Sequence, residues 1–251
     1  FVAWEDYRPN ADTFYISDIY GARVTLQGTV LDPAGIPISA DTNAQLLPAL
    51  AYDGVNLLVT WADYRDDTWF RIHGARVTPQ GTVLDPGGFI VVQAANDQYF
   101  PAAGFDGSNF FVAWADLRGA GYDIHGARVT PQGAVLDPAG FLLFQAVANQ
   151  YDPAIGFDGA NFLLAWEDDR GGTYDIYAGR ATPEGGALDP AGFLVSQSAN
   201  DQNSPVAGFD GEDFLVVWAD DRKGSGWDIY GARVTPEGEV LDPAGFVISE
   251  A

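Results

Sequence analysis

Phe214-Leu215-Val216-Val217-Trp218-Ala219-Asp220-Asp221-Arg222 is the stretch that decides the fold, because similar stretches recur along the whole chain. Each copy joins an apolar run to the pattern Trp-x-Asp-x-Arg, and the five copies begin at Trp4, Trp61, Trp114, Trp166 and Trp218. Self-similarity at a spacing of about 50 residues is typical of β-propeller blades, each of which needs its neighbours to bury a core.

Each repeat contains four short apolar segments, which in the last repeat are residues 205–211, 214–218, 229–235 and 246–249. Four strands in each repeat predict an all-β, five-bladed propeller with four-stranded antiparallel blades. We expect one domain over residues 1–251. Its blades are expected at about 1–44, 45–97, 98–149, 150–201 and 202–251.

The first repeat lacks the segment that forms the inner strand elsewhere. Only four such segments occur, at residues 48–54, 101–107, 153–159 and 205–211. The first blade is therefore expected without its inner strand, and the sequence is interpreted as a piece of a longer chain. The alternative is self-assembly, in which a neighbouring molecule supplies the strand, because unpaired sheet edges invite strand addition.

Composition excludes several classes of partner. The chain has 35 Asp and Glu against 12 Lys and Arg, a formal net charge of -23. This charge repels polyanions, so we expect no nucleic-acid partner. No apolar run is long enough to span a bilayer, so we expect no membrane insertion. The chain has no Cys, which removes disulfides and thiolate metal sites.

Phe209-Asp210-Gly211, Trp218 to Arg222 and Asp228-Ile229-Tyr230 resemble the TolB-type family of bacterial propeller repeats. The resemblance covers every blade and implies protein binding or an accessory role more than catalysis. The repeated Leu-Asp-Pro-x-Gly segment, as in Leu241 to Gly245, departs from that family pattern.

Most basic residues occupy two repeat positions and are predicted to form a structural network. The first set lies two residues after an Asp: Asp6 and Arg8, Asp63 and Arg65, Asp116 and Arg118, Asp168 and Arg170, Asp220 and Arg222. The second set is Arg23, Arg76, Arg128, Arg180 and Arg233. The alternative is five Arg forks for a carboxylate or phosphate ligand, but fivefold repetition favours ion pairs within the scaffold.

A second repeated carboxylate precedes Gly in the turn after each inner segment, at Asp53, Asp106, Asp158 and Asp210. Hard cations take oxygen ligands, so Ca²⁺ is one interpretation of these four carboxylates. We favour an Asp that caps its own turn, and we extend that interpretation to Asp32, Asp85, Asp137, Asp189 and Asp242 before Pro. No other cofactor is expected.

Aromatic residues recur in the loop after each Trp-x-Asp-x-Arg and are the candidate ligand-binding residues: Tyr15, Trp69, Tyr122, Tyr174 and Trp227. A second set, Tyr99 and Tyr151, lies in the links between blades. Such rings can stack on sugars. The alternative is that they cover the edges of the blades.

The predicted function is a non-catalytic interaction scaffold of a bacterial protein, extracellular or periplasmic, that binds carbohydrate or protein. The alternative is a structural subunit of a surface layer or filament. A glycoside hydrolase-like propeller ranks third, because that chemistry needs carboxylic acids that depart from the repeat. The departures noted are Arg71, Glu212-Asp213 and the loop at residues 9–17. His73 and His125 replace a repeated Tyr, and no catalytic residue is predicted.

Overall fold

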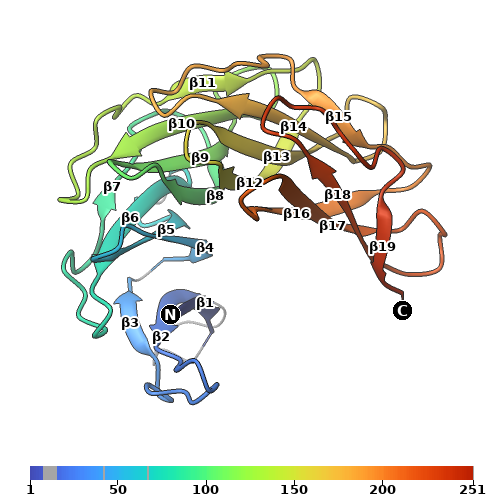
Figure 1. Ribbon diagram of the computed structural model, residues 1–251. Helices are drawn as coiled ribbons and strands as arrows, with labels where there is room; N and C mark the ends of the chain where they lie inside the picture. The colour runs from blue at the N-terminus through green and yellow to red at the C-terminus, as the bar shows by residue number, and fades with distance from the viewer. Residues whose placement is uncertain (8–15, 42, 67, 251) are drawn as a thin grey trace. The chain divides into compact units, whose positions relative to one another are not determined.

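The computed structural model describes residues 1–7, 16–41, 43–66 and 68–250. These residues form five antiparallel sheets and no helix (Figure 1). No helix long and apolar enough to cross a membrane occurs among them. Four sheets have four strands and the first has three, so the chain is a five-bladed β-propeller whose first blade lacks its inner strand.

The strands follow chain order within every blade. The first blade contains β1 (Val2–Asp6), β2 (Asp18–Ala22) and β3 (Ile36–Ser39). The second contains β4 (Gln45–Tyr52), β5 (Leu57–Asp63), β6 (Arg71–Val77) and β7 (Phe89–Ile90). The third contains β8 (Gln98–Phe105), β9 (Phe110–Asp116), β10 (Asp123–Val129) and β11 (Phe141–Phe144). The fourth contains β12 (Gln150–Phe157), β13 (Phe162–Asp168), β14 (Asp175–Ala181) and β15 (Phe193–Ser196). The fifth contains β16 (Gln202–Phe209), β17 (Phe214–Asp220), β18 (Asp228–Val234) and β19 (Phe246–Ser249).

The chain divides into two compact units. The first is Phe1–Val112 with Ala127–Gly140, and the second is Ala113–Gly126 with Phe141–Ala251. The expected single domain and its blade boundaries stay predictions.

The second strand of each complete blade supplies much of the core. Every residue of β5 and of β9 is buried, and the indoles of Trp61, Trp114, Trp166 and Trp218 are at most 1% exposed. These strands are continuously apolar rather than alternating, as expected where both faces of a sheet are covered. The Trp side chain near the end of each of these strands is therefore fixed in position.

The inner strands share a bulge at the residue that precedes proline. The register of pairing shifts there in β4, β12 and β16, because proline has no N–H for the ladder. The pre-proline residues are left-handed, with φ of 58° at Leu47, 53° at Phe100, 47° at Asp152 and 53° at Ser204. This backbone is unfavourable for residues with a side chain and often accompanies functional sites.

Candidate active site

Two acidic residues of the fourth blade depart from the repeat. Glu167 occupies the second position of Trp166-Glu167-Asp168 in β13, where three of the other four copies have Ala. Asp152 is the pre-proline bulge residue of β12, where the other inner strands have Leu47, Phe100 and Ser204. Sequence reasoning missed both residues. The signal that was available is a carboxylic acid at a repeat position that is apolar or neutral in most blades.

Ser204 of the fifth blade links the two carboxyl groups. Its backbone N–H donates to Glu167 Oε1 at 2.6 Å, and its side chain lies close enough to the Asp152 carboxyl to lower the pKa of that group. Within the fourth blade, Tyr151 is the strand partner of Glu167 and directly precedes Asp152. The left-handed bulges therefore bring an acid from each of two strands to one serine, all within the second compact unit.

Both carboxyl groups resist ionisation. Burial is the largest cause that raises the pKa of Glu167 to about 7; the bond from Ser204 N–H opposes it, and the nearby Asp152 and Asp201 add to it. Burial likewise raises the pKa of Asp152 to about 6, and the nearby Ser204 side chain opposes this rise. Both side chains are only partly buried, so solvent reaches them. Near neutral pH one group tends to hold a proton while the other is ionised, which suits general acid–base chemistry.

Three of the predicted aromatic residues gather beside this pair. The Tyr151 ring lies 4.9 Å from that of Tyr122 and 6.1 Å, edge-on, from that of Tyr174. Burial raises the pKa of Tyr151 to about 12, with Tyr174, Tyr122, Asp169 and Glu167 adding to the effect. Its phenol therefore stays neutral at physiological pH.

Polar contacts with the links between blades hold the outer two tyrosines. Tyr122 N donates to Asn149 Oδ1 at 3.1 Å, and Tyr174 N donates to Asp201 Oδ1 at 3.0 Å. Asn149 in turn binds Asp169 through its backbone N–H, at 2.7 Å, and its amide, at 3.0 Å. Tyr122, Tyr151 and Tyr174 thus form a fixed group, which we call the tyrosine cluster.

The other predicted aromatic residues lie elsewhere. In the second blade Phe70, not Trp69, takes the place of Tyr122, because its N–H donates to Asp97 and its ring packs 4.7 Å from Tyr99. Trp69 and Trp227 are exposed. Tyr15 lies outside the described residues.

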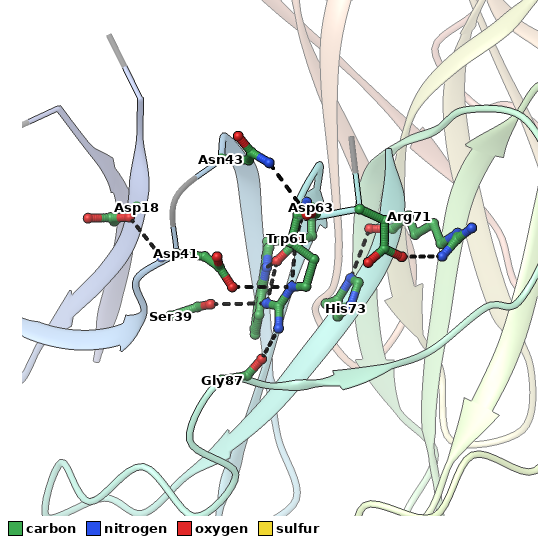
Figure 2. A network of polar contacts seen from close by, with 11 residues as sticks. Asp18, Ser39, Asp41, Asn43, Trp61, Asp63, Arg71, His73 and Gly87 are labelled. Carbon is green, nitrogen blue, oxygen red and sulfur yellow. Dashed lines mark hydrogen bonds and ion pairs between the residues drawn. The ribbon is translucent and has the colours of Figure 1, made fainter. Parts of the chain in front are cut away.

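The first set of arginines binds the Asp two residues earlier. In the second blade, buried Asp63 accepts from Trp61 Nε1 at 2.7 Å and from Arg65 N, Nε and Nη2 at 2.9, 2.9 and 2.6 Å (Figure 2). Arg65 Nη1 also donates to Gly87 O at 2.6 Å. The corresponding Arg–Asp pairs are Arg118–Asp116, Arg170–Asp168 and Arg222–Asp220, at 2.5 to 2.6 Å. In the first blade Asp6 accepts from Trp4 Nε1 at 3.1 Å, and Arg8 lies outside the described residues.

The second set of arginines binds the pre-proline Asp nine residues later. The pairs are Arg23–Asp32, Arg76–Asp85, Arg128–Asp137, Arg180–Asp189 and Arg233–Asp242, at 2.7 to 2.9 Å. The Arg23 hydrogen bonds lower the pKa of Asp32 to about 2. These carboxylates bind guanidinium groups and also the arginine backbone N–H, as at Arg23 and Asp32 (3.0 Å).

The Asp-Gly carboxylates cap their own turns. Asp158 Oδ1, for example, accepts from Ala160 N and Asn161 N, both at 2.7 Å. Asp53, Asp106 and Asp210 make the same pair of bonds. Across the described ranges, no group of three or more His, Cys, Asp or Glu is arranged to hold a metal ion.

His73 and His125 are buried strand residues. The His73 ring lies over Trp61 with the centroids 6.2 Å apart. Burial lowers the pKa of both histidines. Both rings are therefore neutral at physiological pH.

Comparison with known proteins identifies similar folds but does not assign the chain to a family. No family model matches the chain, and no curated protein matches it. Among solved structures, it is similar to a thermostable family-43 glycoside hydrolase (TM-score 0.62, 11% identity, 94% of this chain and 86% of that one). It is also similar to the Cellvibrio cellulosa α-L-arabinanase complexed with arabinohexaose (TM-score 0.53, 14% identity, 80% and 77%). A third similar structure is a putative TolB from Agrobacterium tumefaciens (TM-score 0.50, 17% identity, 82% and 61%).

These comparisons correct the functional expectation. A non-catalytic scaffold and the absence of enzymatic activity were expected, and both expectations are contradicted by fold neighbours that include several glycoside hydrolases. The comparisons include TolB proteins, so the chain has a propeller fold that both groups share, and membership of the TolB-type family is not shown.

Proposed function

We propose that this protein is a glycoside hydrolase-like propeller in which Asp152 and Glu167 are the reacting carboxyl groups. The observation that carries the proposal is the proximity of two partly buried acids, with pKa values of about 6 and about 7, one of which accepts the Ser204 N–H while the other feels the Ser204 side chain. Glycosidases use two carboxyl groups whose environments hold them in different protonation states. The similarity of the fold to family-43 enzymes supports this assignment.

The two pKa values support one assignment of the catalytic roles. Glu167, which keeps its proton to higher pH, gives that proton to the leaving oxygen as the glycosidic bond breaks. Asp152, ionised at lower pH, takes a proton from the water that attacks the anomeric carbon. The products are two shortened sugars, and the two carboxyl groups exchange protonation states, so solvent must return the proton to Glu167.

The tyrosine cluster supplies a binding surface beside the acids. Aromatic faces stack on sugar rings, and the phenol groups hydrogen-bond hydroxyls. The named neighbours include several arabinan-cleaving enzymes, so an arabinose-containing polysaccharide is the proposed substrate class. Such polymers do not cross membranes, which supports an extracellular or periplasmic location.

The test measures release of reducing sugars from arabinan, arabinoxylan and xyloglucan by the wild type and by E167Q and D152N. Both variants are expected to lose at least about 100-fold in kcat, the usual contribution of general acid–base catalysis. The matched control is E5Q. Glu5 accepts Leu47 N–H at 2.7 Å, the same contact that Glu167 makes with Ser204, but the bulge residue there is Leu. E5Q is expected to keep wild-type activity.

Two results would overturn the proposal. One is a wild type that releases no sugar from any of the three polymers. The other is an E167Q variant as active as E5Q.

Two partner predictions accompany the proposal. The net charge of -23 continues to argue against nucleic acid. Self-assembly through the open edge of β1 stays a prediction, supported by the three-stranded first sheet.

A further inference from the structure

The second blade contains a cavity of about 520 Å³ beside β6 and β7. It is lined by Trp69, Arg71, Ile90, Gln93, Ala94 and Ala95, all within the first compact unit. Trp69 is 37% exposed and Arg71 is partly exposed, so solvent reaches both side chains. The cavity is separate in sequence from Asp152, Glu167 and the tyrosine cluster.

A break in the repeat explains what lines this cavity. The residue at the position of Arg71 is Asp in the other four blades, at Asp18, Asp123, Asp175 and Asp228, and each of these side chains is at most 5% exposed. In the third and fourth blades that Asp accepts a bond from a Gln amide: Gln145 to Asp123 and Gln197 to Asp175, both at 3.1 Å. Gln93 stands at the same position as Gln145 and Gln197.

In the second blade this carboxylate–amide bond is replaced by a cation and an amide. Arg71 has donors and no acceptor, so the NH₂ group of Gln93 cannot donate to it as Gln145 and Gln197 donate to Asp. Gln93 is exposed, and both side chains line the cavity instead. The substitution therefore turns a filled polar contact into a cavity that presents hydrogen-bond donors.

Arg71 keeps hydrogen-bonding capacity. Its Nη1 pairs with the Asp66 carboxylate (Figure 2), while its Nε is buried without a hydrogen-bond partner among the described residues. Guanidinium groups carry five donors and favour planar acceptors such as carboxylates. The chain has only 12 Lys and Arg. A guanidinium group beside an exposed indole and an amide, as in this cavity, offers an anionic sugar a cation, an aromatic face and a hydrogen-bonding group together.

We propose that this cavity binds a carboxylated sugar, a hexuronate unit of an acidic oligosaccharide. The sugar ring lies against Trp69, the sugar carboxylate binds the Arg71 guanidinium, and Gln93 binds a hydroxyl. The surrounding net negative charge opposes every anion, the uronate included, so the Arg71 contact, the ring contact and the hydrogen bonds must supply both affinity and selectivity. This site is independent of the proposed catalytic acids, and either can fail without the other.

The test titrates trigalacturonate against the full chain by calorimetry, with galactotriose as the matched neutral probe and inorganic phosphate as the matched anion. The E167Q chain is used so that no hydrolysis confuses the signal. Trigalacturonate is expected to bind at least 10-fold more tightly than either control at about 0.1 M NaCl, where long-range repulsion is largely screened.

Two variants place the site. R71D restores the residue of the other blades and with it the bond to Gln93, so it is expected to fold and to lose at least 10-fold in trigalacturonate affinity. W69A is expected to lose a similar factor, whereas W227A, which removes an exposed indole from another blade, is expected to bind normally.

Three results would overturn the inference. The first is trigalacturonate binding no tighter than galactotriose. The second is phosphate binding as tightly as trigalacturonate. The third is unchanged binding by both W69A and R71D; if R71D fails to fold, unchanged binding by W69A alone would suffice.

Discussion

At the scale of single residues, Glu5 and Glu167 show how one side chain acquires different chemistry in two blades. Both accept the N–H of a left-handed pre-proline residue, at 2.7 and 2.6 Å. Glu167 also lies beside a second carboxyl group, that of Asp152. The shared contact belongs to the scaffold, and the added acid makes the fourth blade a candidate for catalysis.

The raised pKa of Glu167 predicts how stability depends on pH. Folding raises this pKa from 4.5 to about 7, mainly by burial, so the unfolded chain releases this proton at lower pH than the folded one. The free energy of unfolding should therefore fall as pH rises from about 4.5 to about 7.

The variant E167Q keeps an oxygen for Ser204 and removes the ionisation. We expect it to gain about 1 to 2 kcal/mol over the wild type at pH 8, less than the full shift implies because the side chain is partly exposed. At pH 5 the two proteins should melt at nearly the same temperature. Thermal unfolding at both values of pH measures this, and equal melting temperatures at pH 8 would contradict the assigned burial.

At the scale of elements, the repeated parts of each blade were predictable from sequence and the exceptions were not. Trp-x-Asp-x-Arg indicated the second strands and the Asp–Arg contacts, because a pattern repeated five times must serve the scaffold. The missing inner strand of the first blade was predictable for the same reason. The pairing of Arg23 with Asp32 was not, since nothing in the spacing separates a turn cap from a guanidinium partner.

The candidate active site was hidden because it depends on backbone geometry between blades. Ser204 and Glu167 are 37 residues apart in sequence, and left-handed backbone before proline runs against the usual preference of such residues for extended conformations. A one-residue offset had a similar effect in the second blade. Trp69 was aligned with Tyr122, but the strand and its contact with Asp97 place Phe70 there instead.

At the scale of the whole molecule, the formal net charge is -23, and most of the basic residues pair with carboxylates within the repeated scaffold. Ten of the twelve basic residues occupy the two repeated arginine positions. The remaining carboxylates repel one another, and salt screens this repulsion within about 10 Å at 0.1 M.

Added salt is therefore expected to stabilise the protein. We expect the melting temperature to rise by several degrees between about 10 mM and about 0.5 M NaCl at pH 8. CaCl₂ at the same ionic strength serves as the comparison, since a larger rise with Ca²⁺ would indicate specific carboxylate ligands such as Asp53, Asp106, Asp158 and Asp210. A melting temperature that does not respond to NaCl would contradict the electrostatic argument.

The most direct test of the central claim is a pH titration of the side-chain carboxyl carbons by NMR, with the Glu167 and Asp152 signals assigned from E167Q and D152N. We predict titration midpoints near pH 7 for Glu167 and near pH 6 for Asp152, and removal of the Asp152 carboxyl should lower the midpoint of Glu167. Midpoints near pH 4 for both groups, with the Glu167 midpoint unchanged in D152N, would contradict the claim that these two residues form an acid–base pair.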